Sequence, residues 1–127
     1  MGTGTQLGRV RGLGSSHEGT HHWWRQRLTA GSNLFLMAWL MFSLARASSF
    51  DFVALHDWLR SAWVVVPIAL LVGSVVYHMR LGLQVVIEDY AHAESRVVLT
   101  VLLNAYTLIV AGVALFAILR IASGSLA

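Results

Sequence analysis

The sequence predicts an all-α integral membrane protein with three transmembrane helices. The chain has 127 residues, of which 57% are hydrophobic and 12% charged, and its mean hydropathy is +0.67. A soluble domain usually carries about 25% charged residues. Three apolar stretches, each close to the roughly 20 residues that cross a bilayer, alternate with short polar segments.

The composition also excludes several classes of function. The chain has no cysteine, which excludes disulfides, thiol catalysis, cysteine zinc sites and iron–sulfur ligation by this chain. The net charge is +3, and arginine supplies all of the basic residues. Four arginines precede the first apolar stretch: Arg9, Arg11, Arg25 and Arg27. We interpret them as a topology signal and expect no nucleic-acid partner, because no aromatic-basic binding module follows them.

The first span is predicted over residues 28–47. The stretch from Leu28 to Ala45 contains no charged residue. Trp23 and Trp24 precede it, as an interfacial anchor would. Residues 1–27 form a predicted cytoplasmic N-terminal segment, which is polar and rich in glycine and lacks the apolar core of a signal peptide.

The second span is predicted over residues 62–87. The connection before it, Phe50 to Arg60, has the composition of an interfacial turn or a short surface helix. Ser61 is placed to cap the second helix. A charged loop from Glu88 to Arg96 is then expected to lead to the third span, residues 97–121.

Residues 28–127 are therefore predicted to form one three-helix membrane anchor. Three spans place the N-terminal tail and the 88–96 loop on the same side of the membrane, and this side carries more arginine than the other. The excess of arginine places it in the cytoplasm, most simply of a bacterium with an inner membrane. Three helices bury little polar surface between them, so we expect partner helices.

The most informative segment runs from Tyr77 to Tyr90, where ionisable side chains follow a long apolar run. Such groups are costly at membrane depth and indicate function. On a helix, His78 and Asp89 differ by only about 20° in azimuth and lie about 16 Å apart along the axis. One helix face therefore offers a nitrogen ligand inside the membrane and a carboxylate near its edge.

His78 is a candidate axial ligand of haem iron, because a neutral imidazole in an apolar site suits that metal. The alternative is a histidine that is hydrogen-bonded to a neighbouring helix or that lines a water pocket. Gly82 lies one turn later on the same face and would let a flat macrocycle approach the helix. A single histidine cannot supply two axial ligands, so we expect the second from another subunit.

Asp89 and Tyr90 are candidate ligands of a quinone headgroup. A tyrosine hydroxyl can donate to a quinone carbonyl oxygen, and a nearby carboxylate can relay a proton. The alternative is an interfacial turn with an anchoring tyrosine. Arg27 and Arg80 could pair with haem propionates through their guanidinium groups. For Arg80 the stronger interpretation is snorkelling or a pair with Glu88 or Asp89.

Two stretches carry a resemblance to a known family. One is His78-x10-Asp89-Tyr90 at the end of the second span, and the other is the lead-in to the first span, Arg11 to Ser15 and Gly19 to Ala30. With these stretches and its three spans, the chain resembles the small hydrophobic membrane anchor of bacterial succinate dehydrogenase, the respiratory complex II. The resemblance covers nearly the whole chain.

The resemblance implies partners, cofactors and an activity. The anchor pairs with a second three-helix anchor subunit, cytochrome b556, and one haem b lies between them with one axial histidine from each. His78 matches the ligand from this subunit, Asp89 and Tyr90 match residues of the ubiquinone site, and Arg27 matches a basic residue near the haem propionates. On the cytoplasmic face the anchor binds a flavoprotein and an iron–sulfur subunit. The complex oxidises succinate to fumarate as a succinate dehydrogenase (quinone), and the anchor is not catalytic on its own.

Three questions stay open at this point. Glu88 is a departure from some relatives and leaves open which carboxylate acts at the quinone. The chain could also be the anchor of a quinol:fumarate reductase, which runs the opposite reaction. From another class of function, it could be a small membrane protein in which His78 and Asp89 form a proton-relay path.

Overall fold

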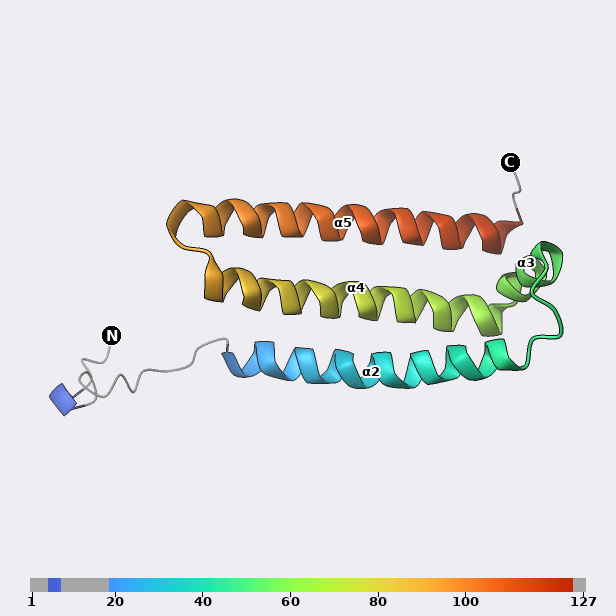
Figure 1. Cartoon of the computed structure of the whole chain (residues 1–127), viewed down its shortest axis with the longest axis horizontal. Helices are drawn as coiled ribbons and strands as arrows, with labels where there is room; N and C mark the ends of the chain where they lie inside the picture. The colour runs from blue at the N-terminus through green and yellow to red at the C-terminus, as the bar shows by residue number, and fades with distance from the viewer. Residues whose placement is uncertain (1–4, 8–18, 125–127) are drawn as a thin grey trace.

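The computed structural model describes residues 5–7 and 19–124. Within residues 19–124 the chain forms four α-helices and no strand: α2 (Gly19–Ala45), α3 (Phe52–Arg60), α4 (Ala62–Tyr90) and α5 (Ala93–Ser123) (Figure 1). The helices α2, α4 and α5 are each long and apolar enough to cross a membrane. The predicted all-α membrane fold with three spans is therefore confirmed.

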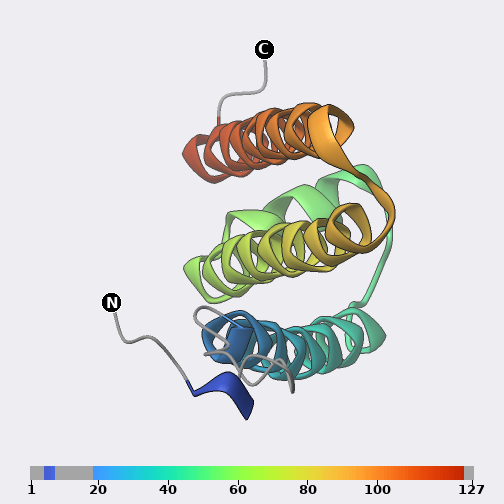
Figure 2. The same ribbon diagram turned by 90° about the vertical axis from the view of Figure 1, so that its left-hand side faces the viewer.

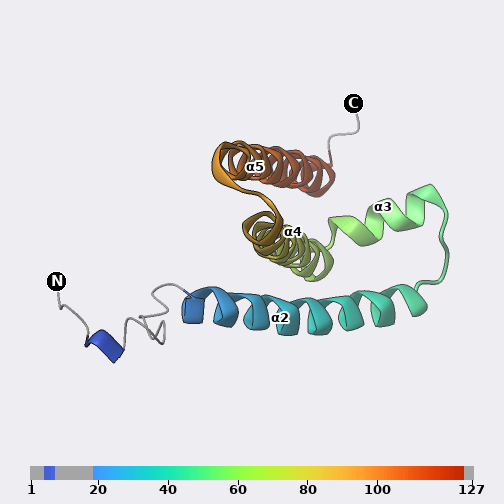
Figure 3. The same cartoon turned by 60° about the vertical axis from the view of Figure 1, so that its left-hand side comes forward.

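The three long helices lie side by side in one row, with α4 in the middle (Figures 1 and 2). α4 contacts both neighbours, whereas α2 and α5 do not contact each other in the described part of the chain. Figure 3 shows α3 outside the row, between the end of α2 and the start of α4, and this short helix contacts α4 and α5. Any site between two long helices of this chain therefore has α4 as one wall.

Few side chains are buried, and most of them belong to α4. Leu81 is only 2% exposed. The other buried apolar residues are Val64, Leu71 and Val76 of α4 and Leu103 of α5. Lipid tails are as apolar as these side chains, so an apolar residue that faces lipid carries no penalty. The exposed apolar faces of the row therefore suit contact with lipid, whereas they would be unfavourable in water.

The turn between α4 and α5 is much shorter than the predicted loop over residues 88–96, and that prediction is wrong. α4 continues to Tyr90 and α5 begins at Ala93, so only Ala91 and His92 have extended backbone. The Ala91 N–H donates to a carbonyl of α4 at 2.9 Å and closes its last turn. The backbone N–H and C=O groups of charged residues are hydrogen-bonded as long as the helix continues. The first charged residue therefore marks the end of the apolar run and not the end of the helix.

The start of α2 also differs from the predicted span. The helix begins inside the segment 1–27 that we expected to precede the membrane. Arg25 and Arg27 consequently lie within its first turns, whereas Arg9 and Arg11 lie outside the described residues. The N-terminal segment is therefore helical over at least part of its length.

The connection predicted as a turn or short surface helix is the helix α3. Asp51 caps it: the carboxylate accepts from the Ala54 N–H at 2.8 Å and from the Ser49 hydroxyl at 2.6 Å. The Ala54 N–H, and after it the Ser49 hydroxyl, lower the pKa of Asp51 below its usual value of 3.8. Ser61 precedes α4 as predicted, but its side chain makes no capping bond. Its carbonyl accepts two N–H groups of α4 instead, at 2.9 and 2.8 Å.

The two ends of the row carry different features. The start of α2 lies at the same end as the α4–α5 turn, and α3 lies at the other end beside the end of α5 (Figure 1). At that second end, Gly124 terminates α5 with a φ of 73°. The Arg60 guanidinium lies so near that a Cβ on Gly124 would come within 2.8 Å of it. A cation near the C-terminus of a helix interacts favourably with the helix dipole.

Candidate functional site

His78 projects from α4 toward α2 and contacts Thr29. Its Nδ1 lies 2.9 Å from the Thr29 hydroxyl oxygen. The same hydroxyl oxygen lies 2.9 Å from the Arg25 carbonyl oxygen and 3.1 Å from the Gln26 carbonyl oxygen, about one turn earlier in α2. The hydrogen bond to a neighbouring helix, which we considered as the alternative to haem ligation, is therefore present. It occupies only one of the two ring nitrogens.

A cavity of about 390 Å³ lies beside His78, between α2 and α4. Its lining consists of His78 and Val85 from α4 and of His22, Trp23, Gln26, Arg27 and Ala30 from α2. The residues from α2 recur at helical spacing because one face of that helix is turned toward the cavity. The volume lies in the range of about 300–1,000 Å³ that is typical of cofactor and ligand sites.

Of two predicted features, Arg27 lines this cavity and Gly82 adjoins one of its lining residues. The Arg27 side chain lies on it, with the guanidinium carbon 5.4 Å from the centre of the Trp23 ring, at cation–π distance. Gly82 lies beside Gln26, and a Cβ at Gly82 would be 3.7 Å from the Gln26 amide nitrogen. The face of Gly82 that we expected to admit a flat macrocycle is thus partly covered by the Gln26 side chain.

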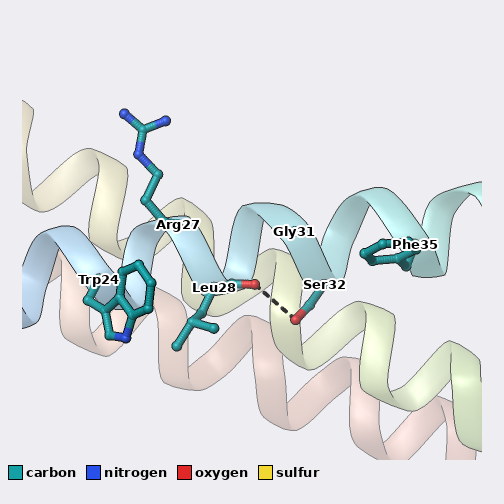
Figure 4. A pocket seen from close by; sticks show the side chains of 6 residues that line it. All are labelled: Trp24, Arg27, Leu28, Gly31, Ser32 and Phe35. Atoms are coloured by element: carbon teal, nitrogen blue, oxygen red, sulfur yellow. Dashed lines mark hydrogen bonds between the residues drawn. The ribbon is translucent and has the colours of Figure 1, made fainter.

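Arg27 also borders a second cavity, of about 330 Å³, on α2 itself (Figure 4). The other lining residues are Trp24, Leu28, Gly31, Ser32 and Phe35. The Ser32 hydroxyl donates back to the Leu28 carbonyl at 3.0 Å, so its proton is not available to a ligand. Arg27 therefore connects this largely apolar surface with the cavity of His78.

Polar side chains gather in a third cavity, of about 370 Å³, near the α4–α5 turn. The lining residues are Gly19, His22 and Arg25 of α2 and Arg80, Leu81, Gln84 and Glu88 of α4. Glu88 accepts a hydrogen bond from the Gln84 side chain at 3.0 Å and lies 3.8 Å from the Arg96 guanidinium. The Glu88 carboxylate therefore contacts one side chain of α4 and one side chain of α5.

Arg80 pairs with no carboxylate within residues 19–124. Its Nε donates to the Asn104 Oδ1 of α5 at 2.9 Å. The predicted pair with Glu88 or Asp89 is therefore wrong. The physical reason is that Asn104 presents a carbonyl oxygen beside Arg80, whereas Glu88 is held toward the turn by Arg96.

Asp89 and Tyr90 occupy the last turn of α4 and are exposed, Tyr90 by 81%. Neither side chain makes a hydrogen bond or an ion pair within the described part of the chain. They lie about 16 Å along the helix from His78. The structure thus brings Arg27 to His78 and leaves Asp89 and Tyr90 as a separate pair at the end of the helix.

The residues around His78 can be compared with the ligand sets that metal ions need. Among the described residues, no group of three or more histidine, aspartate or glutamate side chains could hold a metal ion. His78 is therefore, among these residues, a single donor and not part of a cluster of ligands.

Comparison with known proteins identifies the family. A family model described as the succinate dehydrogenase/fumarate reductase transmembrane subunit matches residues 1–119. The chain belongs to this family. A succinate dehydrogenase hydrophobic membrane anchor subunit of Rickettsia bellii is 35% identical over 86 residues, which are 67% of this chain and 68% of the relative. A subunit of the same name from Rickettsia conorii is 31% identical over 86 residues, with the same shares of 67% and 68%. No solved structure matches the chain.

Membership of the succinate dehydrogenase/fumarate reductase transmembrane family confirms the kind of protein that the sequence motifs indicated. The chain is a multi-pass membrane protein, and its homologues are hydrophobic anchor subunits of succinate dehydrogenase. The resemblance based on the lead-in to the first span and on the His78 segment is thus confirmed at the level of the family.

Sequence reasoning about this family member assigned no role to Thr29 or Gln26 and no partner to Asn104. Each is a polar residue in an otherwise apolar helix, and that was the available signal, because such side chains bond to neighbouring helices in membranes. The choice of partner depends on how two helices are rotated about their axes. Periodicity within one helix does not fix that rotation.

Proposed function

We propose that this chain is the hydrophobic membrane-anchor subunit of a bacterial succinate dehydrogenase that reduces ubiquinone. The two Rickettsia relatives carry the name of that subunit, and the three long helices suit a membrane anchor. The family description also covers fumarate reductase, but the names of these relatives favour succinate oxidation. The observation that carries the detailed proposal is His78, with one ring nitrogen bonded to Thr29 and a cavity beside it.

We assign His78 as a residue that would bind the iron of haem b through a ring nitrogen. Haem iron takes an imidazole nitrogen that carries no proton. The Nδ1 of His78 is occupied by Thr29, whereas Nε2 makes no hydrogen bond within the described residues. The donor set therefore fits the cofactor. Haem b, when bound, supplies one-electron transfer.

The walls around His78 support a site that is shared with a partner. In the part of the chain that the structure describes, the residues that line the cavity come from two helices, α2 and α4. The second anchor subunit, cytochrome b556, would supply a further histidine for the haem iron and the opposite wall. Arg27 lies on the same cavity and would hold a haem propionate, because a guanidinium fork matches a carboxylate in shape and charge.

Tyr90 and Asp89 are proposed to bind the ubiquinone headgroup. Reduction of a quinone to a quinol consumes two electrons and two protons. The electrons come from the iron–sulfur subunit, which receives them from the flavoprotein. The Tyr90 hydroxyl donates to one quinone carbonyl oxygen, and Asp89 passes one proton from water toward that oxygen. The second proton reaches the other carbonyl oxygen from water. The exposure of both side chains at the end of α4 suits this role.

Of the two neighbouring carboxylates, Asp89 is the one that we assign to proton transfer. Glu88 accepts from Gln84 at 3.0 Å and faces Arg96 at 3.8 Å. Asp89 has no comparable partner in the described part of the chain. A carboxylate held by a hydrogen bond and an ion pair is less available to a substrate than one without them.

We propose that the end of the row with the α4–α5 turn faces the cytoplasm of a bacterium and that the helices cross its inner membrane. Near the helix ends, this side holds Arg25, Arg27 and Arg96, and the other side holds Arg46, Arg60 and Arg120. The arginine excess therefore comes from Arg9 and Arg11. The flavoprotein and iron–sulfur subunits would dock at this end, near Tyr90.

The test is purification of the detergent-solubilised complex through a tag on this chain, followed by a dithionite-reduced minus oxidised spectrum. The wild-type complex should show a b-type α-band and contain a flavoprotein and an iron–sulfur subunit. His78→Ala should remove or shift the band, whereas His56→Ala in α3 should leave it unchanged. An unchanged haem spectrum and midpoint potential in His78→Ala would exclude the ligand assignment. A wild-type complex without haem or partner subunits would favour the proton-relay alternative.

A further inference from the structure

We propose that Thr29 is a positioning residue that fixes the tautomer and the ring orientation of His78. The inference rests on the proposed haem ligation by His78. The two residues belong to different helices, α2 and α4, and their side chains meet at 2.9 Å. Thr29 would therefore prepare the ligand from across a helix interface.

The argument begins with the single proton of the Thr29 hydroxyl. The hydroxyl oxygen lies 2.9 Å from the Arg25 carbonyl oxygen, 3.1 Å from the Gln26 carbonyl oxygen and 2.9 Å from the His78 Nδ1. A carbonyl oxygen can only accept a hydrogen bond, whereas a ring nitrogen can donate or accept. If the hydroxyl donated to the ring, its oxygen would face two carbonyl oxygens at hydrogen-bond distance with no proton between them.

The arrangement that satisfies all three contacts has the hydroxyl donating to the backbone of α2. Donation to a carbonyl about one turn earlier is the usual behaviour of threonine within a helix. The lone pairs of the hydroxyl oxygen then remain, and they accept a hydrogen bond from the His78 Nδ1–H. In a neutral imidazole only one nitrogen carries a proton, so Nε2 is left with its lone pair.

This tautomer is the one that a metal ligand needs. A histidine that ligates through Nε2 commonly donates its Nδ1–H to a second group, which sets the ring plane and raises the basicity of the ligating nitrogen. Thr29 supplies such a group from α2, the helix that also carries Arg27 at the cavity wall. The contact between α2 and α4 therefore sets the direction in which Nε2 points.

The experiment uses the purified complex and three variants of this chain. Thr29→Val removes the hydroxyl with little change of shape, and Thr29→Ser keeps a hydroxyl. Thr107→Val is the matched control, because the Thr107 hydroxyl makes the same kind of backbone bond, 2.7 Å to the Leu103 carbonyl, in α5. The measurements are haem affinity, haem midpoint potential and the low-spin electron paramagnetic resonance signal, together with the content of the partner subunits.

We expect Thr29→Val to weaken haem binding by about tenfold or more, to raise the midpoint potential and to shift the resonance signal. Thr29→Ser and Thr107→Val should match the wild type. Three results would overturn the inference. The first is a Thr29→Val complex with the haem affinity, potential and resonance signal of the wild type. The others are a Thr29→Ser complex as impaired as Thr29→Val, or a Thr107→Val complex with the same spectral change as Thr29→Val. His78→Ala is measured alongside, and if it retains an unaltered haem signal, the ligand assignment itself fails rather than the role of Thr29 alone.

Discussion

Breaking the hydrogen bond between Arg80 and Asn104 should weaken the packing of α4 against α5. The donor is a guanidinium nitrogen of a half-buried side chain, and the bond is short, at 2.9 Å. Replacing Asn104 with leucine removes the acceptor and leaves the charged Arg80 without its partner on α5. We therefore expect Asn104→Leu to destabilise the chain.

The size of the effect follows from two reference values. Hydrogen bonds to charged groups contribute about 1.5–3 kcal/mol in soluble proteins. Hydrogen bonds between membrane helices average about 0.6 kcal/mol and reach about 1.7 kcal/mol, because the unfolded chain in the membrane also finds partners. A charged donor with good geometry belongs in the upper part of the membrane range. We expect a coupling of about 1 kcal/mol, which is roughly a fivefold change in the unfolding equilibrium constant.

The assay is a double-mutant cycle on the full-length chain in detergent, unfolded by increasing fractions of SDS. Arg80→Leu, Asn104→Leu and the double variant give the coupling, and a parallel cycle of Arg80→Leu with Glu88→Gln provides the comparison. The Arg80–Asn104 cycle should show the full coupling, and the Arg80–Glu88 cycle should show almost none. A coupling near zero in the first cycle, or a larger one in the second, would refute the assignment of Asn104 as the partner.

Three further predictions concern the end of α4 and the cap of α3. Tyr90→Phe should slow quinone reduction about fivefold, which corresponds to the loss of one hydrogen bond. Succinate oxidation with a soluble artificial acceptor should continue, and equal loss of both activities would mean a defect of assembly. Asp89→Asn should lower quinone reductase activity by about a hundredfold or more and Glu88→Gln should not; the reverse pattern would mean that the wrong carboxylate was chosen. The Asp51 pKa is lowered by its capping bonds, so the cap persists above the usual value of 3.8 and is lost as the pH falls through the lower folded value. The Ala54 amide resonance should report this with an apparent pKa below 3.8, and a midpoint at or above that value would contradict it.

The number and order of the membrane helices could be predicted because long apolar runs leave no other structure in a bilayer. The resemblance to the family could also be recognised from the sequence, because His78, Asp89 and Tyr90 have a characteristic spacing on one helix. These features depend only on residues close to one another in the chain. The fold class and the family therefore followed from the sequence without knowledge of how the helices pack.

The helix ends and the side-chain partners could not be predicted in the same way. Glu88 was expected to begin a loop, but the helix continues to Tyr90 because the reversal needs only Ala91 and His92. For Arg80 we expected snorkelling or a pair with Glu88 or Asp89, but the rotation of α4 against α5 places Asn104 beside it. Both errors concern relations between helices, which single-helix periodicity does not contain.

The single row of helices also determines how the proposed cofactor site can form. α4 and α5 are joined by only Ala91 and His92, so their pairing closes a very short loop. α2 must instead reach α4 across residues 46–61, and closing a longer loop costs more chain entropy. The helix that carries Thr29 and Arg27 therefore pairs with α4 at a greater cost in chain entropy than α5 does, and a cofactor bound between α2 and α4 would offset that cost by holding the two helices together.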